Sequence, residues 1–341
     1  MRNKSIVLVL ALLLAAAGLA FGAAESEEDA ADGYVVGLSN FSVENSWRVQ
    51  MVAEAEYAAS QMDEVARLIV TNSEGSAEKQ VSDIEDLIAQ GVDAILITAA
   101  NPRALVPAVA RAMAEGIVVV DFDNLVDTEN ITSHIVVDQK EFGRVQGDWL
   151  VEQLDGQGQI VAFNGIDGTQ ISADRFEGAK NVFDQYPGIE IVQTVFAAWD
   201  YAQAKRAMES ILAANPNIDG VWSQGGAMSE AVVETYLERD LMPPPVTGED
   251  GNGFLKIWKQ VSEQYPEWSS IATSMPTWVS AQALRIAVQA LDGESVPSVY
   301  EIPIPTITQE TLNDYVKPNL PDSYWTNSDL PESIVADLFE R

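Results

Sequence analysis

The chain has 341 residues, of which 47% are hydrophobic and 21% are charged, and this length suits two globular domains better than one. Asp and Glu number 52 against 19 Lys and Arg, so the formal net charge at pH 7 is −33. A field of that sign repels phosphate backbones and anionic lipids, which argues against nucleic-acid binding and against docking on a membrane surface.

Residues 1–24 have the pattern of a secretory signal peptide. Two basic side chains precede an apolar run of twelve residues, 6–17, and small residues follow it. We expect cleavage after Gly22 or Ala24, and the acidic stretch 25–33 is expected to be a disordered leader. The apolar run is too short to span a bilayer comfortably, so an uncleaved membrane anchor is the weaker alternative.

The chain contains no cysteine, which excludes disulfides, thiol catalysis and lipidation at a cleavage-site cysteine. An exported protein without a lipid anchor stays with its cell only where an outer membrane retains it. The sequence therefore predicts a periplasmic protein with no membrane insertion once the signal is removed. The single histidine, His134, lies in an alternating strand and is expected to be structural, so no metal ligands and no cofactor are expected.

From Tyr34 onward, short apolar β-branched runs alternate with amphipathic segments that end in Gly or Asn. Expected strands are 34–38, 66–71, 93–98, 117–121, 131–137, 159–163, 190–196, 218–222, one near 246, 270–274 and 299–303. Expected helices are 46–61, 77–90, 104–115, 141–154, 172–185, 202–213, 229–239 and 279–291. Such alternation with short connections indicates right-handed βαβ units in doubly wound parallel sheets. The tail from Pro318, rich in Pro, Asp and Ser, is expected to be an irregular strap.

The pattern restarts near residue 131, which indicates two α/β halves of similar size. In open parallel sheets, ligands bind outside the carboxyl ends of the strands, where loops lead into helices. With two such lobes in one chain, we expect the ligand to bind in the cleft between them.

Eight short motifs, in the same order, resemble those of the ribose-, galactose- and galactofuranose-type periplasmic binding proteins of ABC importers. These are Gly37–Asn40 with Asn45–Arg48 (GLSN, NSWR), Gln90–Ile97 (QGVDAILI), Gly116–Asp123 (GIVVVDFD), Ser133–Asp138 (SHIVVD), Gly165–Gly168 with Arg175–Gly178 (GIDG, RFEG), Trp199–Asp200, Trp222–Met228 (WSQGGAM) and Gly248–Gly251 (GEDG). The resemblance covers about residues 34–305 and implies the type I periplasmic binding fold, with two doubly wound lobes joined by a three-segment hinge. We expect an N-terminal lobe of 34–137 plus 275–301, a C-terminal lobe of 138–274 plus 302–317, a tail of 318–341, and hinge crossings near 137–139, 274–276 and 302–303.

The resemblance also implies a sugar ring held between aromatic faces, with its hydroxyls bonded to Asp, Asn, Arg and Gln side chains. The positions that match the family's site are Asn45, Trp47, Asp123, Arg175, Trp199 and Asp250. Charge-assisted bonds from such Asp and Arg side chains are about twice as strong as neutral ones.

Four further site positions depart from the family's usual residues. Arg48 replaces a second aromatic residue, and the Trp-Arg pair is closer to galactofuranose-type binders. Asn124 replaces a common Arg, Gly225 an Asn, and Ser274 a residue that is often Gln. Because the last two changes shorten side chains, they predict a ligand larger than ribose or of a different shape.

Each of these residues also has an ordinary structural interpretation. Trp47 and Trp199 could be core aromatics, as we expect of Trp222 inside its apolar strand. The two arginines could pair with surface carboxylates, and Asp123 and Asp250 could cap helices.

The sequence predicts a monomeric, non-enzymatic binding protein that delivers a pentose, hexose or furanose to a permease in the inner membrane. No catalytic residues are expected, because no nucleophile elbow, phosphate loop or His-based triad is present. A lac-type transcriptional regulator would carry a helix-turn-helix where this chain carries a secretion signal. Open alternatives are a sugar acid clamped by two arginines, a nucleoside, a cyclic polyol, and a role as ligand receptor for a chemoreceptor or other signalling partner.

Overall fold

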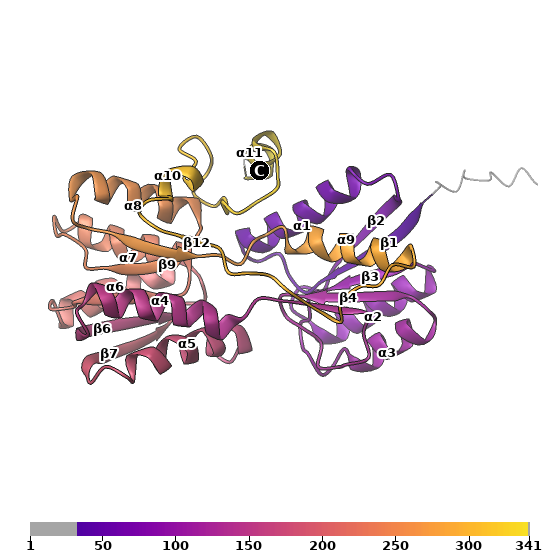
Figure 1. Ribbon diagram of the computed structural model, residues 1–341, viewed down its shortest axis with the longest axis horizontal. Helices are drawn as coiled ribbons and strands as arrows, with labels where there is room; N and C mark the ends of the chain where they lie inside the picture. Colours follow the sequence, from indigo (N-terminus) through magenta and orange to yellow (C-terminus); the bar gives the residue numbers. More distant parts are fainter. Residues whose placement is uncertain (1–32, 340–341) are drawn as a thin grey trace, which may run out of the picture. The chain divides into compact units, whose positions relative to one another are not determined.

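A computed structural model describes residues 33–339, so the expected signal peptide and nearly all of the acidic leader lie outside the described residues. The described residues form two α/β lobes, each built on a six-stranded sheet (Figure 1). The strand orders are β2-β1-β3-β4-β5-β11 in lobe 1 and β7-β6-β8-β9-β10-β12 in lobe 2. All pairs are parallel except β10 with β12, so the expected pair of doubly wound parallel-sheet lobes is confirmed.

Every expected strand and helix overlaps an observed one. Lobe 1 contains β1 (Tyr34–Asn40), α1 (Ser46–Ser60), β2 (Val65–Asn72), α2 (Ala77–Ala89), β3 (Ala94–Ile97), α3 (Val106–Ala114), β4 (Val118–Phe122), β5 (Ser133–Val136), α9 (Val279–Leu291) and β11 (Val299–Glu301). Lobe 2 contains α4 (Gln139–Gln153), β6 (Gln157–Asn164), α5 (Gln170–Phe183), β7 (Gly188–Phe196), α6 (Tyr201–Ala214), β8 (Gly220–Ser223), α7 (Gly226–Leu237), β9 (Val246–Glu249), α8 (Asn252–Gln264), β10 (Ser270–Thr273) and β12 (Thr306–Ile307). Two short helices follow, α10 (Leu312–Tyr315) and α11 (Glu332–Phe339).

The chain passes between the two sheets three times. It leaves lobe 1 between β5 and α4, returns between β10 and α9, and leaves again between β11 and β12. These connections comprise residues 137–138, 274–278 and 302–305. Because β5 and β11 of lobe 1 are separated in sequence by most of lobe 2, and β10 and β12 of lobe 2 by α9 and β11, neither sheet is complete without these crossings.

The core of lobe 1 has two layers because strand side chains alternate between the two faces of its sheet. Leu38, Leu96 and Val120 pack under α1 and α9, whereas the neighbouring Ile95 and Val119 pack on the other face under α2 and α3. All five are fully buried. Burial on both faces explains why these strands read as unbroken apolar runs.

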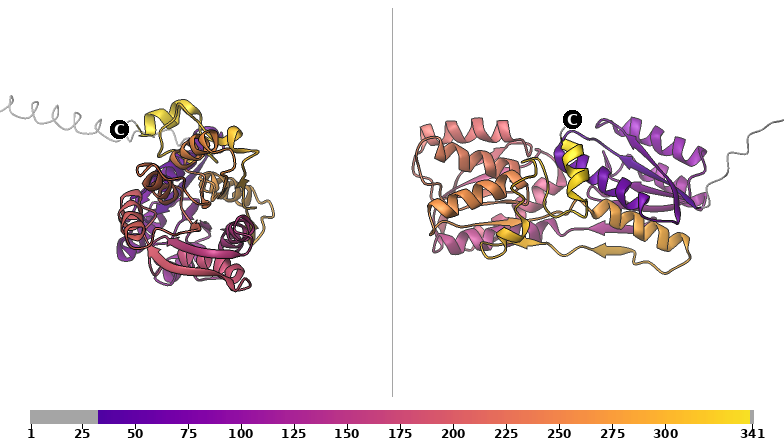
Figure 2. Two further views of the ribbon diagram at one scale, coloured as in Figure 1. Left: turned by 90° about the vertical axis from the view of Figure 1, so that its left-hand side faces the viewer. Right: turned by 90° about the horizontal axis from the view of Figure 1, so that it is seen from above.

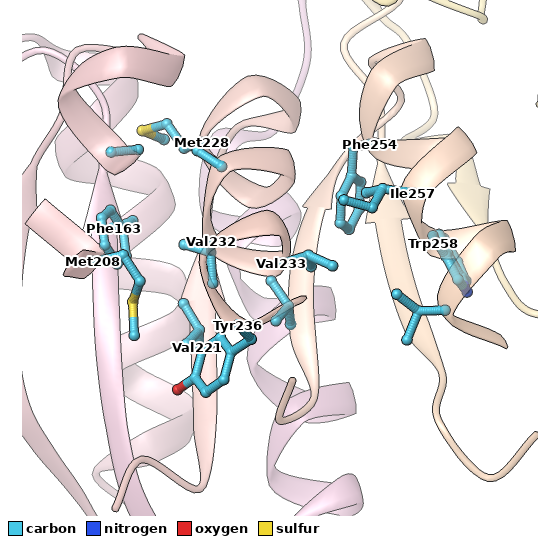
Figure 3. Close-up of a cluster of buried hydrophobic side chains, with 14 of the residues drawn as sticks. Phe163, Met208, Val221, Met228, Val232, Val233, Tyr236, Phe254, Ile257 and Trp258 are labelled. Atoms are coloured by element: carbon cyan, nitrogen blue, oxygen red, sulfur yellow. The ribbon is translucent and has the colours of Figure 1, made fainter. Parts of the chain in front are cut away.

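Lobe 2 is built in the same way. Figure 3 shows the layer beneath α6, α7 and α8, where Phe163 and Val221 of the sheet meet Met208, Val232 and other helix side chains. The opposite face packs against α4 and α5 and buries the expected core residue Trp222, whose ring lies 5.7 Å from that of Phe176. The two layers fix the sheet edge from which the candidate site residues emerge.

Helices α4 and α5 pack closely because glycines lie at their crossing. A Cβ at Gly143 would meet the carbonyl oxygen of Arg175, and a Cβ at Gly178 would meet that of Lys140. No larger residue fits at these two positions without moving a backbone. This crossing sets the position of Arg175 on α5.

The sequence patterns missed four elements in the last third of the chain, which are α8, β12, α10 and α11. Helix α8 was not expected, because Gly251 and Gly253 at its start are poor helix formers and obscure the apolar spacing that follows. The expected irregular strap from Pro318 is only partly irregular, since it ends in α11. Val335 on α11 packs with Ala53 on α1, and Figure 2 shows these two helices side by side. No helix among residues 33–339 has the length and apolarity needed to cross a membrane.

Candidate ligand-binding site

The predicted site residues gather where the strands of each sheet end. In lobe 1, β1 leads through a loop to Trp47 and Arg48 in the first turn of α1, and β4 leads directly to Asp123. In lobe 2, Trp199 follows β7 and Asp250 follows β9. This is the edge at which ligands bind in open parallel sheets.

Arg48 forms a buried ion pair with Asp123. Its Nη2 lies 2.6 Å from Asp123 Oδ2, and the two side chains are only 8% and 4% exposed. The Thr98 hydroxyl donates to the same carboxylate oxygen at 3.1 Å, and the guanidinium lies 3.8 Å from the Phe41 ring centroid. Asp123 has a φ of 60°, a left-handed conformation that is uncommon outside glycine and concentrates at functional sites.

Two predicted Asn residues support this pair from the adjoining loops. Asn45 caps α1, because its side-chain oxygen accepts a hydrogen bond from the Arg48 backbone N–H at 3.0 Å. The carbonyl of Asn124 accepts from the Ala99 N–H at 2.8 Å, which fixes the loop after Asp123. Asn45 is exposed and Asn124 half-buried.

Trp47 lies in the core of lobe 1 and is 9% exposed. Its indole N–H donates to the carbonyl of Met275, in the second crossing, at 2.7 Å. The Met275 sulfur in turn lies 4.0 Å from Nη2 of Arg175 in lobe 2. This placement favours the structural interpretation of Trp47 and makes Met275 a contact of both Trp47 in lobe 1 and Arg175 in lobe 2.

Arg175 forms a second buried ion pair, with Glu249 at the end of β9. Nη1 lies 2.8 Å from Glu249 Oε1, and the side chains are 4% and 5% exposed. Nε donates to Gln139 Oε1 at 2.7 Å, and the guanidinium lies 3.8 Å from the Phe142 ring centroid. Burial raises the pKa of Glu249 to about 7; Arg175 opposes the rise, and the neighbouring carboxylate of Asp250 adds to it.

Asp250 is buried without a cation beside it. Its Oδ2 accepts from the Asn327 backbone N–H at 2.8 Å, whereas Oδ1 has no hydrogen-bond partner among the described residues. Burial raises the pKa of Asp250 to about 6, although the Asn327 N–H and the Ser274 hydroxyl act in the opposite direction. Ser274 is itself fully buried and accepts from the Asn327 side-chain amide at 3.3 Å.

Trp199 is half-buried and lies between two glycines. A Cβ at Gly225 would come within 2.6 Å of its Cδ1, and a Cβ at Gly165 would overlap its six-membered ring. The indole N–H donates to the Gln224 carbonyl at 3.2 Å, and Trp199 has a φ of 54°. Gly225 therefore makes room for an aromatic ring, and the missing side chain does not by itself imply a larger ligand.

Comparison with known proteins agrees with the two-lobed architecture. A family model described as a periplasmic binding protein domain matches residues 36–295, about three quarters of the chain. The chain belongs to this family. The family recognised from the sequence motifs is thereby confirmed.

Three similar proteins illustrate this membership of the periplasmic binding protein family. The ribose import binding protein of Bacillus subtilis (strain 168) is 26% identical over 279 residues, covering 81% of this chain and 88% of the relative. The structure of an ABC transporter solute binding protein from Thermobispora bispora is 27% identical, with a TM-score of 0.75, covering 85% and 90% of the two chains. A periplasmic solute binding protein from Actinobacillus succinogenes 130z, solved with bound D-allose, is 27% identical, with a TM-score of 0.72, covering 83% and 100%.

Relatives named as solute-binding and import binding proteins agree with the expectation of a non-enzymatic role. No cluster of three or more metal-ligating side chains occurs within residues 33–339. His134 is tied at both ring nitrogens, to Asp121 Oδ1 at 2.7 Å and the Thr128 carbonyl at 2.9 Å, which supports its structural interpretation. A separate groove is lined by His134, Asn101 and Glu129, among other residues. It contains neither the Arg48–Asp123 pair nor the Arg175–Glu249 pair.

The sequence patterns did not single out several residues of this candidate site. Glu249, Phe41 and Phe142 complete the two arginine clusters. The Gly-Glu-Asp-Gly motif contained Glu249, but the resemblance directed attention to the next residue. Phe41 directly follows β1, so its place at the strand end could have been inferred from the sequence. The approach of Phe142 to Arg175, by contrast, depends on the α4–α5 crossing.

Proposed function

We propose that this periplasmic binding protein binds a neutral monosaccharide, a pentose, hexose or furanose, between its lobes. The observation that carries the proposal is that both arginines are already paired with buried carboxylates. Neither guanidinium is left to neutralise a charged ligand. Each is instead held rigid on a phenyl ring, as a fixed donor of hydrogen bonds.

The charge of the site disfavours an acidic ligand. Two guanidinium groups face three carboxylates, Asp123, Glu249 and Asp250, so the net charge is −1 when all three are ionised. Because the pKa of Glu249 is about 7, the sum lies between −1 and zero at neutral pH, and it becomes positive only when Asp250 is also protonated, below about pH 6. A sugar acid would enter a region without surplus positive charge, within a chain of net charge −33.

The same groups suit a polyhydroxylated neutral ring. The half-buried indole of Trp199 offers an apolar face on which sugar C–H groups can stack. The free oxygen of Asp250 can accept a hydroxyl hydrogen in a charge-assisted bond. A ligand that contacts residues of both lobes would favour the state in which they approach each other.

The proposal of a role in transport rests on what similar proteins are named for and were solved with. One is named for ribose import, and another was solved with D-allose, both neutral sugars. We therefore infer delivery to an inner-membrane ABC permease by a protein that is freed into the periplasm when its signal peptide is cleaved. Recognition of the same liganded form by a signalling partner is the second role that we propose. The lobe limits 34–137 plus 275–301 and 138–274 plus 302–317, with hinge crossings between them, belong to this proposal.

A thermal-shift screen of residues 25–341 tests the function. The panel should contain D-ribose, D-allose, other pentoses and hexoses, cyclic polyols, nucleosides, D-glucuronate and D-galacturonate. A ligand at about 100 times its Kd stabilises the native state by roughly 2.7 kcal/mol, a readily measured shift. The proposal predicts hits among neutral sugars that disappear in Trp199→Ala. Stabilisation by the two sugar acids alone would refute it.

A further inference from the structure

The C-terminal segment after lobe 2, residues 317–339, lies outside the part of the chain matched to the family. Its first portion is fastened to lobe 2 by Asn252, a fully buried side chain at the start of α8. The amide nitrogen of Asn252 lies 2.9, 3.1 and 3.0 Å from the carbonyls of Lys317, Leu320 and Pro321, so its two N–H groups are shared among three acceptors, and its oxygen accepts from the Lys317 N–H at 2.9 Å. Hydrogen bonds to one buried side chain thus fix this end of the segment.

The next portion is fastened to α1 of lobe 1. The Gln50 side chain donates to the Trp325 carbonyl at 2.9 Å and accepts from the Trp325 N–H at 3.0 Å, as a paired strand would. Glu54 Oε1 accepts from the Ser328 hydroxyl at 2.6 Å and from the Asp329 N–H at 3.1 Å. Gln50 and Glu54 are both buried, although each is a polar residue on a helix.

Between these two attachments, the segment holds the carboxylate of Asp250. The Asn327 N–H donates to Asp250 Oδ2 at 2.8 Å, and the Thr326 N–H donates to the Asp250 carbonyl at 3.1 Å. The Asn327 side chain donates to Ser274 Oγ at 3.3 Å and accepts from the Trp278 indole at 3.2 Å. Two predicted site residues, Asp250 and Ser274, are thus held by one residue of the tail.

We propose that residues 317–339 form a clasp that ties α1 of lobe 1 to the end of β9 in lobe 2, and that Asn327 is the positioning residue for Asp250. The ligand-related part of this inference rests on the proposed function, whereas the clasp itself does not. The second oxygen of this oriented carboxylate is buried and has no partner among the described residues, so a ligand hydroxyl that reaches it in the liganded state would meet an acceptor already fixed in direction. When the clasp opens, water reaches Asp250 and its carboxylate loses its fixed direction.

The test opens the clasp at Gln50 and Glu54 of α1, whose side chains form no hydrogen bond with Asp250 or with either arginine but also bond Thr277 in the second crossing. The double variant Gln50→Glu, Glu54→Gln keeps side-chain volume but replaces a donor to Trp325 and weakens the acceptor for Ser328 and Asp329. The matched control is Glu56→Gln, an exposed carboxyl on the same helix. Three quantities are compared in the full mature chain: amide hydrogen exchange over 325–329, the pKa of Asp250 by carboxyl-carbon NMR, and the Kd for D-allose and D-ribose.

If the clasp holds the tail, amide exchange over 325–329 should be faster in the double variant. The pKa of Asp250 should be lower, because burial is the main cause of its rise. The Kd for the sugar should be raised about 5- to 10-fold. The control should change none of these. Exchange equal to that of the control would overturn the clasp. Faster exchange with an unaltered pKa of Asp250 would overturn the positioning role of Asn327. If neither sugar binds the wild type, the proposed function is in difficulty, but exchange and the pKa still decide the clasp.

Discussion

Arg175 Nη1 lies 2.8 Å from Glu249 Oε1, and neither side chain is more than 5% exposed. The same relationship is found in lobe 1, where Arg48 pairs with Asp123 at 2.6 Å. Each lobe therefore presents one arginine that is charge-neutralised, buried and stacked on a phenyl ring. We expect such arginines to discriminate among ligands by the direction of their hydrogen bonds and not by net charge.

Glu249→Gln should change which ligands bind. The substitution releases Arg175 from its carboxylate and removes one negative charge from the site. We expect the affinity for D-glucuronate relative to D-allose to rise about tenfold or more, measured by calorimetry. Glu267→Gln, an exposed carboxyl in lobe 2, is the control and should leave the ratio unchanged. An unchanged ratio in Glu249→Gln would contradict the charge argument.

Asp250→Asn should make the protein more stable and bind sugar more weakly. Folding raises the pKa of Asp250 from 3.8 to about 6, so the ionised carboxyl destabilises the native state above pH 6. The variant should be more stable by about 1–3 kcal/mol at pH 8, and this difference should vanish below about pH 4, where the carboxyl is protonated in both states. Thermal unfolding at both pH values measures it. A lower melting temperature at pH 8 would contradict the assignment.

Sugar affinity should fall as the pH decreases through about 6. A ligand hydroxyl donates to the ionised form of Asp250, and protonation removes that acceptor. We expect the Kd for a bound neutral sugar to rise severalfold between pH 7.5 and 5. Asp250→Asn should abolish the part of this dependence that is centred near pH 6, and a change centred near pH 7 that persists in the variant would belong to Glu249.

Gly225→Ala should displace the ring of Trp199. The added Cβ would lie 2.6 Å from Cδ1 of the indole, which is less than any normal contact. We expect a shifted Trp fluorescence and a Kd raised about tenfold. In a Trp199→Ala background the same substitution should have no further effect on binding. An additional loss there would show that Gly225 serves something other than the indole.

Much of the fold could be predicted from the sequence because its determinants are local. Alternating apolar strands and amphipathic helices fixed nearly every element, and the residues that follow strand ends, such as Asp123 and Asp250, could be placed at the site edge. Helix α8 was missed because Gly251 and Gly253 mask its start.

Long-range contacts could not be predicted in the same way. Trp47 and Trp199 are both tryptophans near loop mouths, yet one is buried against Met275 and the other lies half-exposed between glycines. Nothing local distinguishes them. The attachment of the tail to Asp250 joins residues 77 positions apart and depends on how the tail folds back across both lobes. Glu249 lies within the Gly248–Gly251 motif, but its pairing with Arg175 depends on the packing of α5 against the sheet edge.

The most direct test of the central claim is calorimetric titration of residues 25–341 at pH 7.5 with D-allose and D-ribose on one side and D-glucuronate and D-galacturonate on the other. We expect saturable binding of at least one neutral sugar and at least tenfold weaker binding of its acidic counterparts, because Arg48 and Arg175 are each paired with a carboxylate. Tighter binding of a sugar acid than of any neutral sugar would contradict it.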